Sequence, residues 1–121
     1  MTRVLIVDDS PTETHVLREM LEKHDYQVSV ADNGEDGIKL AQNAAPDVIL
    51  MDIVMPGVNG FQATRKLTKD PATAGIPIVI ISTKDQDTDR IWGMRQGARD
   101  YISKPVTEQE LLEKIEGALK G

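Results

Sequence analysis

The stretch Val48-Ile49-Leu50-Met51-Asp52 sets four large apolar residues in a row and then ends on a carboxylate. A short apolar run of this kind predicts a strand buried on both faces, because the strands of a parallel sheet are covered by helices above and below. A charge next to such a strand is costly unless it has a partner or a chemical role. The stretch therefore predicts a buried parallel strand with a chemically active Asp52 at its end.

Apolar runs of similar length recur at residues 4–7, 28–31 and 78–81, and a shorter one lies at residues 101–102. The segments between these runs have helical spacing of apolar side chains, so strands and helices alternate. Parallel strands joined by helices use right-handed crossovers and build a doubly wound sheet. We therefore predict an α/β fold of five parallel strands and five helices, with its ligand site beyond the carboxyl ends of the strands.

Two helix starts share a pattern of hydroxyl and acid. Ser10 is followed three residues later by Glu13, and Thr107 is followed three residues later by Glu110. In a capping box, the hydroxyl of the first residue and the carboxylate of the second each bind the other residue's backbone N–H. Both patterns therefore predict helices that begin with capping boxes.

Size and composition restrict the class of protein. The chain has 121 residues, which suits a single domain over residues 1–121. Cysteine is absent, so the chain has neither a disulfide framework nor a thiolate metal site, which agrees with a reducing cytosol. No apolar stretch is long enough for membrane insertion. A net charge of −6 and few aromatic residues argue against nucleic-acid binding. We therefore predict a cytoplasmic protein whose partners are other proteins.

Polar residues follow four of the predicted strands. They are Asp8 and Asp9 after the first strand, Asp52 after the third, Ser82 and Thr83 after the fourth, and Lys104 after the fifth. The carboxyl ends of parallel strands meet at one edge of the sheet, so these side chains are expected to lie together. Gathered carboxylates repel one another, and a hard cation such as Mg²⁺ relieves that repulsion through oxygen ligands. His15 and His24 do not lie at strand ends, which disfavours a nitrogen-bound transition metal.

This group of side chains suits phosphoryl transfer. An Asp52 oxygen can attack phosphorus in line, while the cation and the Lys104 ammonium neutralise charge on the phosphoryl oxygens. A hydroxyl from Ser82 or Thr83 can hydrogen-bond the attached group and report phosphorylation to the rest of the fold. We therefore assign Asp52 as the phosphoacceptor and Lys104 as its ammonium partner.

Structural explanations exist for each of these residues. Asp8 and Asp9 would favour the positive end of the first helix. Asp52 could close a turn, and Lys104 could be an exposed lysine before a helix. Their joint placement at strand ends favours one shared function over several separate structural roles.

The predicted fourth helix leaves the role of Trp92 open. Ile91, Met94, Arg95 and Ala98 trace one helical stripe. Trp92 lies about 100° from Ile91 around the helix. It therefore either covers the edge of the core or faces a partner protein.

The motifs together resemble response-regulator receiver domains of the CheY type, over all 121 residues. The resemblance rests on Asp8-Asp9, Asp52, Met55-Pro56-Gly57, Asn59-Gly60, Ser82 and Lys104-Pro105. It implies a flavodoxin-like sheet in the order 2-1-3-4-5, with Mg²⁺ as cofactor. It also implies that Asp9, Asp52 and the Val54 backbone carbonyl bind the metal directly, that Asp8 acts through water, and that the Lys104–Pro105 bond is cis.

Three further stretches resemble the single-domain receivers of the chemosensory pathway that controls twitching motility by type IV pili. They are residues 9–13, 59–65 and 92–101. Two positions depart from the flagellar-chemotaxis receiver, where Val54 replaces a polar residue and Lys84 replaces an acid. A metal can still bind the Val54 carbonyl, but the lifetime of the phosphoryl group stays open.

The resemblance implies a phosphorylation-controlled interaction module. A histidine kinase of a chemosensory array supplies the phosphoryl group, and the signalling surface lies on the fourth helix, fifth strand and fifth helix, including Trp92, Tyr101 and Pro105. Ser82 is expected to move toward Asp52 on phosphorylation, and Tyr101 is expected to turn inward into the space that Ser82 leaves.

With no output domain expected in residues 1–121, a monomeric receiver would act on a separate motility protein. A phosphate sink that drains a shared kinase is an alternative that uses the same chemistry. A Mg²⁺-dependent phosphohydrolase with Asp52 as nucleophile is a weaker one, because such enzymes commonly use a second acid where Val54 stands. We therefore predict a phosphoacceptor that promotes its own phosphorylation and dephosphorylation, rather than an enzyme.

Overall fold

The computed structural model describes residues 1–121 and consists of five strands and five helices that alternate along the chain. The strands are β1 (Arg3–Val7), β2 (Gln27–Ala31), β3 (Val48–Met51), β4 (Ile78–Ser82) and β5 (Asp100–Ser103). The helices are α1 (Pro11–Glu22), α2 (Gly34–Ala44), α3 (Gly60–Lys69), α4 (Asp87–Arg95) and α5 (Glu108–Leu119). None of these helices combines the length and the apolar composition that a membrane crossing requires.

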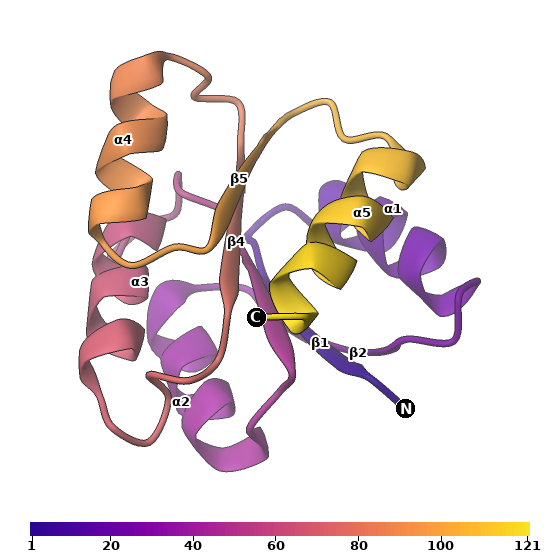
Figure 1. Ribbon diagram of the computed structural model, residues 1–121, viewed down its shortest axis with the longest axis horizontal. Coiled ribbons are helices and arrows are strands. Elements are labelled where there is room, and N and C mark those ends of the chain that lie inside the picture. Colours follow the sequence, from indigo (N-terminus) through magenta and orange to yellow (C-terminus); the bar gives the residue numbers. More distant parts are fainter.

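The five strands form one parallel sheet in the order β2-β1-β3-β4-β5 (Figure 1). This confirms the predicted doubly wound fold and its strand order. The chain proceeds from β1 to β2 on one side and then returns to build β3, β4 and β5 on the other side. The ends of β1 and β3 therefore mark the point where the strand order reverses, which is where such folds place their ligand sites.

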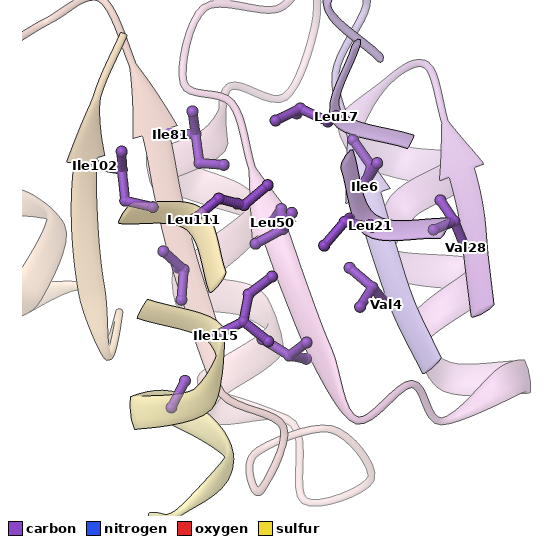
Figure 2. Close-up of a cluster of buried hydrophobic side chains, with 13 residues drawn as sticks. Val4, Ile6, Leu17, Leu21, Val28, Leu50, Ile81, Ile102, Leu111 and Ile115 are labelled. Carbon is purple, nitrogen blue, oxygen red and sulfur yellow. The ribbon is translucent and has the colours of Figure 1, made fainter. Parts of the chain in front are cut away.

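Apolar side chains of each strand alternate between the two faces of the sheet, as the two-residue period of a strand requires. On one face, a cluster of 13 buried residues joins the sheet to α1 and α5, with Ile6, Leu50 and Leu111 among them (Figure 2). On the other face, a cluster of 10 buried residues joins the sheet to α2 and α3. This double coverage explains why residues 48–51 are apolar without interruption.

Helix α4 approaches the sheet through a glycine. A Cβ atom built on the buried Gly93 would lie 2.8 Å from the end of the Ile80 side chain, so a larger residue would require Ile80 or the helix to shift. Ile91, Trp92 and Met94 are about half exposed, at 53%, 49% and 46%. Trp92 is therefore half exposed on the surface of α4 rather than buried at the edge of the core.

The capping boxes predicted for α1 and α5 are only half formed. The Ser10 hydroxyl accepts a hydrogen bond from the Glu13 N–H (3.3 Å), and the Thr107 hydroxyl accepts one from the Glu110 N–H (3.1 Å). The reciprocal bonds are absent. At α1 the reason is local, because the Ser10 N–H already donates to Asp8 Oδ1 (2.8 Å). The Glu13 carboxylate is consequently available for another contact.

Candidate functional site

Backbone pairing continues one residue beyond several strands and fixes where the polar side chains emerge. The Asp8 N–H donates to the last residue of β2 (3.0 Å), and the Asp52 N–H donates to the last residue of β1 (2.9 Å). The Lys104 N–H donates to the last residue of β4 (2.9 Å). All three side chains therefore leave the sheet at its carboxyl-terminal edge, as the sequence predicted. This edge, where Asp8, Asp52 and Lys104 meet, is called the rim below.

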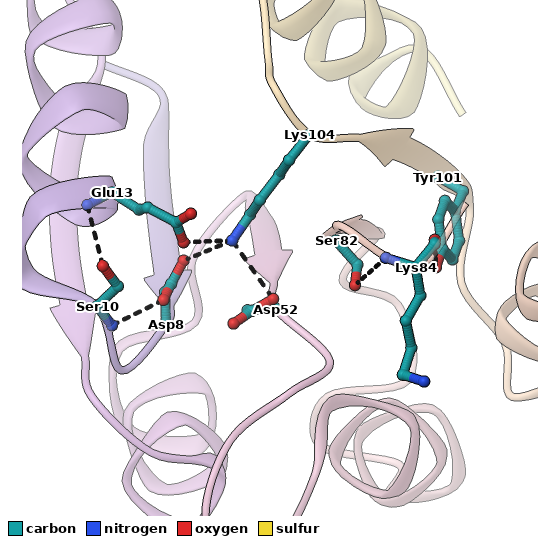
Figure 3. A network of polar contacts seen from close by, with 8 residues as sticks. All are labelled: Asp8, Ser10, Glu13, Asp52, Ser82, Lys84, Tyr101 and Lys104. Atoms are coloured by element: carbon teal, nitrogen blue, oxygen red, sulfur yellow. Dashed lines mark hydrogen bonds and ion pairs between the residues drawn. The ribbon is translucent and has the colours of Figure 1, made fainter.

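The Lys104 side chain crosses this rim from the edge strand β5 toward β3 and β1 (Figure 3). Its Nζ atom lies 3.5 Å from Asp52 Oδ1 and 3.4 Å from Asp8 Oδ2, and it also contacts the Glu13 carboxylate. The Lys104 side chain is only 12% exposed, so these contacts are poorly screened by water. One ammonium thus links carboxylates from β1, α1 and β3.

The loop that follows Asp52 folds back tightly against it. The Gly60 N–H donates to the Ile53 carbonyl (2.9 Å). A Cβ atom on Gly60 would lie 2.0 Å from the Asp52 carbonyl oxygen and 2.7 Å from Ile53 Cα, both of which are backbone atoms. Glycine at this position is therefore required for the loop to close beside the carboxylate.

The pKa of Asp52 is raised from 3.8 to about 6, mainly by burial and also by the charge of Asp8, while Lys104 opposes the shift. Burial also raises the pKa of Asp8. Burial acts to lower the pKa of Lys104, but the hydrogen bond to Glu13 and the charges of Asp52 and Asp8 outweigh it, so the pKa is raised. Three carboxylates around one ammonium leave an excess of negative charge that attracts cations.

One carboxylate oxygen from each of Asp8, Glu13 and Asp52 lies within 4.8 Å of the other two. This all-oxygen donor set suits a hard divalent cation such as Mg²⁺, which accepts a few carboxylates and keeps part of its water shell. The pKa values of Asp8 and Asp52 are both raised chiefly by burial, and a nearby positive charge would oppose both shifts. The residues at this rim therefore fit the predicted cofactor.

The structure places Asp8, rather than Asp9, beside Asp52. Asp8 is 3% exposed and belongs to the carboxylate cluster, whereas Asp9 is exposed and lines a hollow next to it. Asp9, the predicted direct ligand, thus borders the site from this hollow, and Asp8, predicted to act through water, lies within the cluster. The Val54 side chain points to solvent, and its carbonyl accepts no hydrogen bond within the chain.

Ser82 and Thr83 differ in their exposure to solvent. Ser82 is fully buried at the end of β4, and its hydroxyl accepts a hydrogen bond from the Lys84 N–H (3.1 Å). Thr83 is exposed. Of the two predicted hydroxyls, the structure thus brings Ser82 to the inner side of the rim (Figure 3).

Tyr101 is already buried, at 2% exposure, and its hydroxyl donates to the Lys84 carbonyl. The Arg90 guanidinium lies 5.1 Å from the centre of its ring. The expected inward turn of Tyr101 on phosphorylation therefore does not fit this structure, where the ring fills a small cluster with Ile80 and Ala98. The predicted cis bond before Pro105 is present.

Sequence reasoning did not find Glu13 as a site residue. The sequence places it in the first turn of the helix that starts at the rim, and the capping-box explanation accounted for it fully. Its carboxylate reaches Lys104 because the Ser10 N–H is bound by Asp8. An acid three residues after the N-cap of a helix that leaves the site is the signal that could have identified it.

Residues 4–116 match the family model of the response regulator receiver domain, and the chain belongs to this family. Over its full length the chain is 63% identical to the protein PilH of Pseudomonas aeruginosa, and the match covers all of that protein. The predicted resemblance to receiver domains is thus confirmed.

Two solved structures are similar along nearly the whole chain. The chemotaxis protein CheY4 of Vibrio cholerae has a TM-score of 0.92 at 28% identity, and the match covers 98% of this chain and 99% of that one. The receiver domain of sensor histidine kinase PA1611 of Pseudomonas aeruginosa has a TM-score of 0.92 at 27% identity, covering 99% and 98%. That structure has a magnesium ion coordinated in its active site cleft.

Proposed function

We propose that Asp52 accepts a phosphoryl group from a histidine kinase in a Mg²⁺-dependent reaction, and that phosphorylation switches the binding of another protein. The observation that carries this proposal is the Lys104 ammonium, which lies within 3.5 Å of both Asp8 and Asp52. A poorly hydrated lysine shared by two carboxylates responds strongly to charge added to either of them. Membership of the receiver family supports the same assignment.

In the proposed transfer, an Asp52 carboxylate oxygen attacks the phosphorus of a kinase phosphohistidine in line. The O–P bond forms as the P–N bond breaks, and the imidazole nitrogen keeps the electron pair of the broken bond. Lys104 then donates to the phosphoryl oxygens. Attack of water on the same phosphorus restores Asp52 and releases inorganic phosphate, so the receiver promotes both its own phosphorylation and its own dephosphorylation.

Asp8 and Asp52 would hold the Mg²⁺ ion, together with the Val54 carbonyl and, from the adjoining hollow, Asp9. When bound, the ion neutralises part of the charge on the phosphoryl oxygens. Asp8 would contribute most among the remaining acids, because it is buried in the same cluster as Asp52.

Chelation of divalent ions is expected to stop phosphorylation of Asp52. Asp8→Asn is expected to weaken Mg²⁺ binding by about tenfold or more, because it removes a buried carboxylate from the site. Asp9→Asn is the matched control and is expected to have a smaller effect, since Asp9 is exposed. Titration calorimetry with MgCl₂ compares the two variants. Full phosphorylation in EDTA would contradict the metal requirement, and a larger effect at Asp9 would reverse the ligand assignment.

A chain of hydrogen bonds connects Ser82 to the surface of α4 and β5. The Ser82 hydroxyl accepts from the Lys84 N–H, and the Lys84 carbonyl accepts from the Tyr101 hydroxyl (Figure 3). If the Ser82 hydroxyl turns to a phosphoryl group on Asp52, the Lys84 backbone loses one of its two anchors. Tyr101 and the neighbouring α4 would respond through that shared residue.

Lys104→Ala is expected to leave the fold intact and to uncouple phosphorylation from this response. The ammonium is the cation that would follow the phosphoryl group, and the apolar core does not depend on it. Trp92 fluorescence is a suitable reporter, because Trp92 is half exposed on α4. Beryllofluoride with Mg²⁺ should change the emission of the wild type and should have little effect on the variant. An equal change in both would show that Lys104 does not couple the site to α4.

We further propose that this receiver is a cytoplasmic monomer and acts on a separate protein in the control of type IV pilus twitching motility. The supporting observation is its 63% identity to PilH over the full length of both chains. Ile91, Trp92 and Met94 give α4 an exposed apolar surface that such a partner could cover.

A phosphate sink is the alternative function, since it needs the same site. The phosphohydrolase is disfavoured by Val54, whose apolar side chain cannot act as a general acid.

The direct test mixes the protein with radiolabelled phosphorylated histidine kinases of a chemosensory array. Label is expected to pass to the receiver and then to appear as inorganic phosphate. A partner protein that binds only the phosphorylated form would establish an output role, whereas rapid loss of label without such a partner would favour the sink. No transfer from any chemosensory kinase would contradict the proposed pathway.

A further inference from the structure

Glu13 is a third carboxylate at the rim, and its role is not explained by helix capping. Its side chain contacts Lys104 Nζ, and one of its carboxylate oxygens lies within 4.8 Å of an oxygen of Asp8 and an oxygen of Asp52. The Glu13 side chain is 43% exposed, whereas that of Lys104 is 12% exposed. Glu13 can therefore swing into water, while Lys104 cannot leave the rim as easily.

We propose that Glu13 is a positioning residue that holds the Lys104 ammonium away from the phosphoryl group and so makes the phosphorylated state less favourable. This inference rests on the proposed role of Asp52 as phosphoacceptor. Lys104 contacts Glu13 together with Asp8 and Asp52 in the unphosphorylated protein. The ammonium is thus shared among three acids before any phosphoryl group arrives.

The direction of the effect follows from this sharing. A phosphoryl group on Asp52 brings additional negative charge, and Lys104 must give up part of its contact with Glu13 to neutralise it. The remaining Glu13 charge also lies close enough to repel the phosphoryl oxygens. Removing that charge frees the ammonium and favours the phosphorylated state.

Glu13 has the opposite influence on Mg²⁺. Its negative charge adds to the field that attracts the cation, so its removal should weaken metal binding modestly. A variant that merely damaged the fold would weaken the binding of both the cation and a phosphoryl mimic. Tighter binding of the phosphoryl mimic together with weaker binding of Mg²⁺ is therefore the result that identifies the proposed role.

The test compares wild type, Glu13→Gln and the control Glu19→Gln by titration calorimetry. Glu19 lies on the same helix, and its side chain is 68% exposed and pairs with His15, so its substitution removes an equal charge away from the rim. Beryllofluoride is titrated at saturating Mg²⁺, and Mg²⁺ is titrated separately. Glu13→Gln is expected to bind beryllofluoride about fivefold more tightly and Mg²⁺ about twofold more weakly, as suits a half-exposed ion pair. Glu19→Gln should match the wild type in both titrations.

A second comparison shows whether Glu13 acts through Lys104. In a Lys104→Ala background, Glu13→Gln should increase beryllofluoride affinity by much less than fivefold, because the ammonium that Glu13 holds is gone and only the direct repulsion by its exposed charge is left. The same gain in both backgrounds would overturn the proposal, as would weaker beryllofluoride binding in Glu13→Gln. If the wild type itself bound no beryllofluoride, the proposed phosphoacceptor site would fail along with this inference. If the wild type bound beryllofluoride and Glu13→Gln bound it with the same affinity, this inference alone would fail.

Discussion

Replacing Asp52 by Asn is expected to stabilise the protein when divalent ions are removed. The pKa of Asp52 is raised from 3.8 to about 6, mainly by burial, so its ionised form is disfavoured in the folded chain. A shift of this size corresponds to a destabilisation of about 3 kcal/mol at neutral pH, and asparagine removes it. Such a carboxylate is retained at the cost of stability, as is common for functional groups.

The sign of the pH dependence follows from the direction of this shift. A carboxyl group with a raised pKa in the folded state holds its proton to higher pH than in the unfolded chain. Its unfavourable contribution is therefore absent below pH 4, develops between pH 4 and pH 6, and is complete above pH 6. The stability difference between Asp52→Asn and wild type should grow across this window.

Urea denaturation in EDTA at several pH values measures this difference directly. Asp9→Asn serves as the control, because Asp9 is exposed and its substitution should leave stability nearly unchanged. Saturating Mg²⁺ should reduce the advantage of Asp52→Asn, since the metal stabilises only a folded chain that can bind it. A wild type that was more stable than Asp52→Asn at pH 7.5 without metal would contradict the claim that the ionised Asp52 carboxylate destabilises the folded chain.

Gly60→Ala is expected to cost about 3 kcal/mol or more, near the upper end for overpacking. The added methyl group would lie 2.0 Å from the Asp52 carbonyl oxygen and 2.7 Å from Ile53 Cα. Backbone atoms cannot move aside as a flexible side chain can, so the loop must open. Because the loop starts at Asp52, phosphorylation should fall as well.

Gly117→Ala is the matched control for this prediction. Gly117 lies within α5, and nothing lies within 4 Å of a Cβ atom built there. Alanine should therefore stabilise the helix by up to about 1 kcal/mol. Chemical denaturation of both variants provides the comparison. Equal stability of Gly60→Ala and wild type would show that the close approach of α3 to Asp52 is not needed.

The fold was predictable because its signals are local and repeated. An uninterrupted apolar run such as residues 48–51 identifies a strand covered on both faces, and the alternation of strands with helices restricts the topology to a few choices. The same topology places Asp8, Asp52 and Lys104 at one rim. Strand ends could thus be assigned to a shared site before any contact was known.

Other features of the site depend on competition for hydrogen bonds, which the sequence does not show. Glu13 fits a capping box equally well, and only the bond between the Ser10 N–H and Asp8 leaves its carboxylate for Lys104. The orientation of Tyr101 depends likewise on the position of α4, whose approach at Gly93 no local pattern specifies. Sequence patterns indicate which residues reach the rim, whereas tertiary packing decides which of them touch.

The most direct test of the central claim is the intact mass of the protein after treatment with acetyl phosphate and Mg²⁺. The wild type is expected to gain the mass of one phosphoryl group, and acid treatment should remove it. The Asp52→Asn protein should gain nothing under the same conditions. A phosphoryl group that persisted in Asp52→Asn, or one that survived acid in the wild type, would contradict the assignment of Asp52 as the phosphoacceptor.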